Sequence, residues 1–212
     1  SYTGSLTVKN GAKVCFNDAA TFGGSGNKIA ISGKSSLTYR TLSIAGDIVA
    51  NDATVVLTNE TLVTGGTATF TNCSVVMAKD YATKYGGNDF SINFVDSNVA
   101  MSNRWALQGT NFTFRVDNSH VVFTADQPFF TGGDDAMNGD RRRFVFEGAD
   151  PYLRINGNRG FYMRGAVDLV FNMGEGNFPE NHAVIELDDA MTELKKVTDA
   201  TDAAYTKFFN KC

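Results

Sequence analysis

Asn72-Cys73-Ser74-Val75-Val76-Met77 is the clearest copy of a pattern that recurs along most of this chain. A polar residue or a glycine is followed by a small residue, then by any residue, and then by two apolar residues that flank one further position. Other copies span residues 11–16, 35–39, 52–57, 96–101 and 118–123, with a looser copy at 148–153. Apolar residues at every second position predict a β-strand with one buried face.

The small residue of each copy sets the length of the repeat. These residues are Ala12, Ser35, Ala53, Cys73, Ser97, Ser119 and Ala149, separated by 23, 18, 20, 24, 22 and 30 residues, with a mean of about 23. Helical repeats are longer, at roughly 33 to 47 residues. No helical period of 3.6 residues occurs before residue 188, so the repeat is predicted to consist of β-strands.

Each repeat contains two further short strands. An alternating segment such as Ile92-Asn93-Phe94 precedes the small residue, and a third such as Trp105-Ala106-Leu107 follows it. Three strands and three corners form one coil of a triangular parallel solenoid, with coils about 4.8 Å apart. The alternative is a sandwich of hairpins, which would need two-residue Asn-Gly or Asp-Gly turns that are scarce here. We therefore expect an all-β, single-stranded parallel β-helix of about eight coils over residues 1–187.

The phrases Leu6–Val14 and Ile92–Val99 carry a resemblance to known proteins. They resemble the repeats of right-handed parallel β-helix families, especially the passenger domains of autotransporters and other bacterial surface proteins. The resemblance covers roughly residues 5 to 175 and lies in the repeat pattern rather than in a family-specific motif. It implies a β-solenoid in an extracellular or cell-surface location, and it implies little about activity.

The solenoid pattern also predicts which side chains face the core. The apolar pair of each repeat, such as Val75 and Met77, is expected to point inward. Cys73 is expected to be a buried, unreactive thiol, and His120 a solvated surface residue. Trp105 is expected in the core rather than in a sugar platform. Apolar residues at the middle, outward position of the strands indicate a partner or a covering element. They are Val56, Val76, Ala100 and Val122.

Composition excludes several classes of protein. The chain has 212 residues, 42% of them hydrophobic, which argues against disorder, and it has no apolar run of the ~20 residues needed to span a membrane. Its net charge of −4 argues against nucleic-acid binding, which needs a basic face. With two histidines and three cysteines, no metal site or cofactor is expected. No signal peptide stands at its start, and the composition is typical of exported bacterial β-proteins.

A charged, glycine-rich insertion offers the best candidate for chemistry. Sites for acidic polysaccharides combine carboxylates with arginines. The candidate ligand-binding residues are Asp134, Asp135, Asp140, Arg141, Arg143 and Arg154. Their spacing matches neither an EF-hand loop nor the catalytic motifs of polygalacturonases or pectate lyases, so no catalytic residue is assigned. The competing interpretation is a solvated loop that balances its own charges.

Three functions remain open on this evidence. The leading hypothesis is a non-catalytic, extracellular structural or adhesive module of a bacterial surface or secreted protein, which binds a polysaccharide or a cell-surface glycan. The second is a carbohydrate-active domain, either a lyase or hydrolase of acidic polysaccharides or a binding domain. The third is a subunit that stacks end to end with itself, because residues 5–8 form a strand edge with no proline or charge cluster to block it.

The pattern changes at Asp188. Met191, Leu194, Thr198, Thr201, Tyr205, Phe208 and Cys212 recur at steps of three and four, which predicts one amphipathic helix over residues 188–212. A helix of about 31 Å would be long enough to lie along the solenoid over the outward apolar residues. Cys212 would then approach Cys15, and we predict a disulfide between them in an exported protein, with Cys73 free. Alternatively, the helix leads to a further domain and Cys212 is a free terminal thiol.

Overall fold

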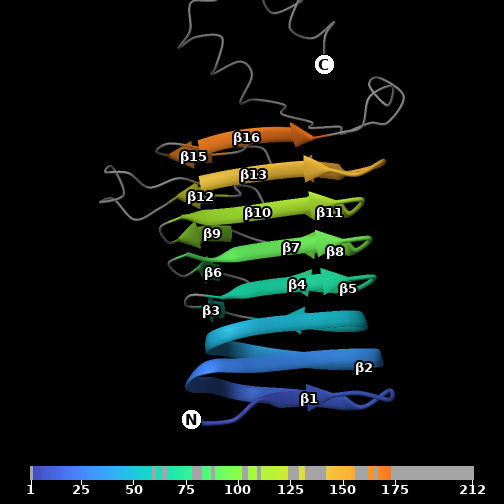
Figure 1. Cartoon of the computed structure of the whole chain (residues 1–212), viewed down its shortest axis with the longest axis vertical. Coiled ribbons are helices and arrows are strands. Elements are labelled where there is room, and N and C mark those ends of the chain that lie inside the picture. The colour runs from blue at the N-terminus through green and yellow to red at the C-terminus, as the bar shows by residue number, and fades with distance from the viewer. Residues whose placement is uncertain are drawn as a thin grey trace, which may run out of the picture.

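The computed structural model describes residues 2–58, 61–63, 66–77, 83–86, 89–101, 105–108, 111–123, 129–131, 142–155, 162–164 and 167–172. These residues form a parallel β-solenoid in which each coil stacks on the one before it (Figure 1). The predicted all-β fold is confirmed, and the described residues contain no helix. The helix predicted over residues 188–212 lies outside them, as does the predicted boundary at residue 187.

The strands form three sides. The first side contains β1 (Leu6–Val8), part of β2 (Lys13–Leu57), β4 (Thr67–Thr71), β7 (Ser91–Val95), β10 (Phe112–Asp117), β13 (Arg142–Glu147) and β16 (Val167–Asn172). The second contains part of β2, β5 (Ser74–Met77), β8 (Asn98–Met101), β11 (His120–Phe123) and β14 (Tyr152–Ile155). The third contains part of β2, β3 (Thr61–Val63), β6 (Thr83–Gly86), β9 (Trp105–Gln108), β12 (Phe129–Thr131) and β15 (Tyr162–Arg164).

Strand register confirms most of the predicted repeat. On the second side Thr54 pairs with Ser74, Ser74 with Asn98, and Asn98 with His120, which gives steps of 20, 24 and 22 residues. The last copy was placed wrongly. His120 pairs with Tyr152, a step of 32 residues, so buried Pro151 takes the position that the sequence pattern assigned to Ala149.

The solenoid makes about five turns over the described residues, fewer than the eight coils expected. On the third side the ladder runs from β2 through β3, β6, β9, β12 and β15, which is five steps. Corners of several later coils lie outside the described residues.

The core is one continuous column of apolar side chains. The inward pairs are buried as predicted, for example Val75 and Met77, which are at most 2% exposed. Phenylalanine rings pack against one another from coil to coil, with centroids 5.4 Å apart for the stacked pair Phe70–Phe94 and 5.5 Å apart for the edge-to-face pair Phe94–Phe114. The prediction fails in the first coil, where Val14 and Phe16 are only partly buried because no described coil lies beneath them.

The corner between the first and second sides repeats one backbone conformation. Asp52, Asn72, Asp96 and Asn118 each precede the small residue and have φ between 47° and 51°. Asn and Asp tolerate this left-handed region better than other non-glycine residues. The small residue that follows each of them is buried.

Serine hydroxyls connect these corners from coil to coil. The Ser97 hydroxyl donates to the Val95 carbonyl (2.8 Å) and accepts the Cys73 backbone N–H (3.0 Å). The Ser119 hydroxyl in turn accepts the Ser97 N–H (2.9 Å). Each hydroxyl therefore satisfies a buried N–H of the preceding coil, which a corner outside the regular strand ladder would otherwise leave unpaired.

Two glycines permit close packing at the corner between the third and first sides. A Cβ on Gly46 would lie 2.0 Å from the Asn27 carbonyl oxygen, and one on Gly66 would lie 2.1 Å from the Gly46 carbonyl oxygen. Successive coils therefore touch through backbone at this corner, and only glycine fits there.

Candidate functional site

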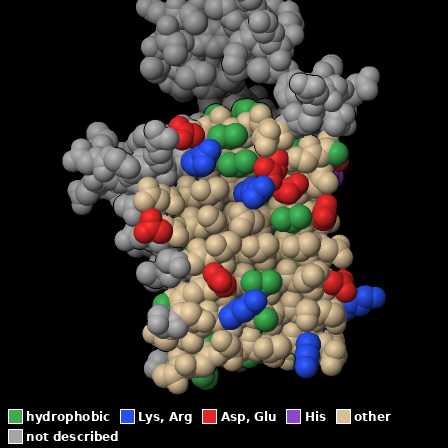
Figure 2. Space-filling view, in the orientation of Figure 1, with side chains coloured by type: hydrophobic (Ala, Val, Ile, Leu, Met, Phe, Trp, Pro, Cys, Tyr) green, Lys and Arg blue, Asp and Glu red, His purple; other side chains and the backbone are tan. Residues whose placement is uncertain are grey.

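Charged side chains gather on the first side of the solenoid, over β10 and β13 (Figure 2). Arg115 and Asp117 point outward from β10, and Glu147 points outward from β13. Asp117 and Glu147 occupy the same register position on neighbouring strands. Together with Asn118, His120, Asp150 and Tyr152, which lie around the adjoining corner, we call these residues the corner cluster.

The corner cluster holds a carboxylic acid whose proton is retained to higher pH. The Arg115 guanidinium pairs with the Glu147 carboxylate through its Nε and Nη2 atoms. Partial burial raises the pKa of Asp117, and the neighbouring Glu147 carboxylate raises it further, partly opposed by Arg115. The raised pKa of Asp117 therefore reflects its burial and the second carboxylate at the neighbouring register position.

A two-residue insertion shapes the other half of the corner cluster. Where the preceding coil passes from Asp117 to His120, this coil passes from Glu147 to Tyr152. The Asn118 side-chain oxygen accepts the backbone N–H groups of Ala149 (2.6 Å) and Asp150 (3.0 Å). The inserted residues are therefore held by hydrogen bonds.

This insertion brings an acid to the histidine. Asp150 Oδ2 lies 3.2 Å from His120 Nε2, and the rings of His120 and Tyr152 have centroids 5.4 Å apart. His120 is solvent-exposed, as the sequence predicted, and it also contacts two residues of the next coil. Outward rings beside a carboxylate and an amide are groups that hold polar ligands such as sugars.

Two of the predicted ligand-binding residues can be placed. Arg143 is exposed on β13, where it pairs in register with Asp168 on β16. Arg154 is exposed on β14 on the second side, next to Val122 in register. These two arginines lie on different sides of the solenoid. Asp134, Asp135, Asp140 and Arg141 lie outside the described residues.

Sequence reasoning overlooked Asp117 and Glu147. The available signal was the alignment of Phe112–Asp117 with Arg142–Glu147, which share inward apolar residues at matching positions and each end in an acid.

The outward apolar residues of the second side form a vertical column. Val56 pairs with Val76, Val76 with Ala100, and Ala100 with Val122. The three valines are half-buried and Ala100 is exposed. The helix predicted to cover them lies outside the described residues, so this part of the prediction stays untested.

Two of the three cysteines are described, and both are free thiols. Cys73 is 4% exposed, its thiol donates to the Thr71 carbonyl (3.1 Å), and burial raises its pKa. The prediction of a buried Cys73 is confirmed. Cys15 is exposed, and its thiol donates to the Asn17 side chain. Cys212 lies outside the described residues, as does the side chain of Trp105.

An aromatic group closes part of the N-terminal end. The Tyr2 backbone pairs with residues 21–23, and its ring stacks on Phe22 with centroids 5.1 Å apart. A pocket of about 430 Å³ lies beside it, lined by Tyr2, Thr3, Gly4, Ser5, Leu6, Phe16 and Phe22. No charged side chain lines it, so the pocket offers apolar contact and few groups that would orient a ligand.

Among the residues that the structure describes, no group of three or more metal-binding side chains comes together. No helix in that part of the chain is long and apolar enough to cross a membrane. Comparisons with protein families, with characterised proteins and with solved structures find no match. The fold itself defines the chain as a parallel β-solenoid protein.

Proposed function

We propose that this protein is a non-catalytic structural or adhesive module of a bacterial surface or secreted protein. The observation that carries the proposal is the stack of coils around one continuous core (Figure 1). Such a stack is a stiff support whose outward side chains are held in fixed rows, which suits contact with an extended polymer or a cell surface.

The outward surface supports a binding role. The corner cluster offers a guanidinium, carboxylates, an amide and two rings on adjacent strands, with contacts between Arg115 and Glu147, between His120 and Asp150, and between His120 and Tyr152. Polysaccharides are recognised by such mixtures of polar and aromatic groups. The proposal therefore includes a polysaccharide or cell-surface glycan as partner, with an extracellular or cell-surface location.

Fractionation and binding test this proposal together. Antibody against the protein is expected to detect it in the medium or on intact cells of the source organism. The purified protein is expected to bind cells or a glycan panel saturably without releasing product. Confinement to the cytosolic fraction, together with no binding to any surface, would overturn it.

A carbohydrate-active enzyme is the second candidate, and Asp117 is the observation that favours it. An acid with a raised pKa beside a second acid and an arginine resembles an acid–base pair. Product release from acidic polysaccharides that is lost in Asp117→Asn and Glu147→Gln would support this candidate. Equal release by the wild type and both variants would assign the activity elsewhere in the preparation or the chain.

End-to-end stacking is the third candidate. The lower edge of β1 has no partner strand in the described part of the chain, since β1 pairs only with β2. Tyr2 covers part of the third side at that end, which limits how closely a second copy can approach. Polymers that form with rising concentration in light scattering would favour stacking.

A further inference from the structure

One lysine occupies a backbone position that is otherwise reserved for Asn, Asp and Gly. The residue before the small corner residue is Gly11, Lys34, Asp52, Asn72, Asp96 or Asn118 in successive coils, and each has positive φ. Lys34 has φ 59° and is the one described non-glycine residue with positive φ that is neither Asn nor Asp. The left-handed region is sterically unfavourable for such a residue, because its Cβ comes too close to the following carbonyl oxygen. Asn at position 34 would fit this backbone better than Lys.

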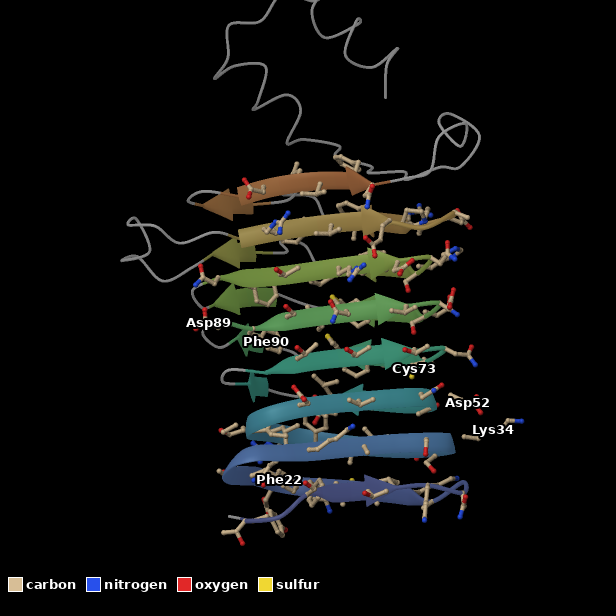
Figure 3. The ribbon with its side chains drawn as sticks, in the orientation of Figure 1. Phe22, Lys34, Asp52, Cys73, Asp89 and Phe90 are labelled. Carbon is tan, nitrogen blue, oxygen red and sulfur yellow. The ribbon has the colours of Figure 1, made fainter. Side chains whose placement is uncertain are left out.

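Lys34 extends into solvent at this corner, below Asp52 in the column (Figure 3). Lys9 and Lys13 lie at the same corner of the coil beneath and are also exposed. None of the three lysines forms an ion pair with another described residue, because the described ion pairs are Arg115–Glu147 and His120–Asp150. The three lysines therefore present charges without an ion-pair partner among the described residues, at one corner of two neighbouring coils.

The surrounding sequence concentrates positive charge at this end. Residues 1–40 contain five basic residues and one acidic residue, a net charge of +4. The whole chain has a net charge of −4, so residues 41–212 carry −8. Further along the same corner the column continues with Asp52 and Asp96. A bound anion would therefore be attracted to the first two coils and repelled by the coils above.

We propose that Lys9, Lys13 and Lys34 form a binding ridge for a linear acidic polysaccharide that carries carboxylate or sulfate groups. The inference rests on the proposed adhesive function and names its ligand class. The strained backbone at Lys34 is retained because the lysine contributes to binding, and the acids above it restrict the ligand to a path across the corner.

The shape of the ridge favours a polysaccharide over two other polyanions. A lipid surface placed against the N-terminal end would reach Lys9 and Lys13, but Lys34 lies one coil higher, about 4.8 Å farther away. Single-stranded nucleic acid would need aromatic platforms between the cations, and the ridge contains none. A flexible chain of spaced anionic groups can contact all three lysines across a convex edge.

Lys34→Asn separates binding from stability. The variant is expected to raise the Tm by roughly 2–4 °C because Asn tolerates the left-handed backbone. It is expected to bind polygalacturonate or heparin roughly fivefold more weakly at low salt, since one cationic contact is lost. Binding by the wild type is expected to weaken as salt rises, with a shallower dependence in the variant.

Lys28→Asn is the matched control, because Lys28 is an exposed lysine of the same coil at a different corner. It is expected to leave binding unchanged. The ridge proposal would be overturned if the wild-type protein bound neither polysaccharide. It would also be overturned if the Lys34→Asn variant bound both as tightly as the wild type does. Stronger binding to phosphatidylserine vesicles or to DNA than to polysaccharide would overturn the ligand class. Neither result affects the adhesive proposal, which cell-surface binding tests separately.

Discussion

At the scale of single residues, the buried serines of the corner differ in what their hydroxyls do. The Ser97 hydroxyl accepts the buried Cys73 N–H, whereas the equally buried Ser35 hydroxyl has no hydrogen-bond partner. Ser97→Ala is expected to destabilise the protein by about 1–3 kcal/mol, because it leaves the buried Cys73 N–H without a hydrogen-bond acceptor. Ser35→Ala is expected to be neutral or slightly stabilising. Urea unfolding of both variants measures the difference, and equal losses would contradict the assigned hydrogen bond.

Asp117 predicts a pH dependence with a definite sign. Burial and Glu147 raise the pKa of Asp117 above its unfolded value, so the folded protein binds more protons than the unfolded chain between the two pKa values. Stability is therefore expected to fall as pH rises through that window and to stay level above it. Asp117→Asn removes this contribution. Tm measured from pH 3 to 8 in both proteins tests it, and an identical pH profile would contradict the assignment.

At the scale of strands, the phenylalanine column dominates the energetics. Phe114 is fully buried and contacts Phe94 and Phe144 in the neighbouring coils. Phe114→Asp is expected to prevent folding, since an unpaired buried charge costs several kcal/mol or more. Asn98→Asp, at an exposed position of β8, is expected to leave the Tm almost unchanged. Far-UV circular dichroism separates the two outcomes, and a folded Phe114→Asp protein would show that the column tolerates charge.

The strands are also where prediction from sequence worked best. Val75 and Met77 are two positions apart, as apolar residues are when one face of a strand is buried. The fold class and the inward pairs could therefore be predicted from this spacing. The corners were harder. The small residue at Ala149 matched the pattern, but burial and strand register select Pro151, because a corner can absorb two extra residues without changing the strands.

The corner cluster could not be predicted for a similar reason. Asp117 and Glu147 are 30 residues apart in sequence and become neighbours only through the register of β10 and β13. That register depends on the length of the insertion between the strands, which no local pattern determines. Lys34 was equally hidden, since its significance depends on a backbone dihedral angle that is unusual for lysine.

At the scale of the whole molecule, the disulfide between Cys15 and Cys212 remains a prediction. It would close nearly the entire chain and stabilise the fold by about 4–5 kcal/mol in the chain-entropy model. Exposed Cys15 is available for it, and buried Cys73 is not. Mass spectrometry after alkylation of the denatured protein without reductant decides the question. One modified thiol at Cys73 is expected, and three modified thiols would reject the bridge.

The corners also govern how this molecule can change in length. On the first side, consecutive strands are 23, 20, 24, 22, 30 and 25 residues apart where the register is described, yet their side chains stay in the same columns. The loops at the corners accommodate these differences in the number of residues, and the strands keep a constant spacing. Duplication or loss of a coil in the gene would therefore alter the reach of the protein in increments of about 4.8 Å, while both ends keep their own chemistry.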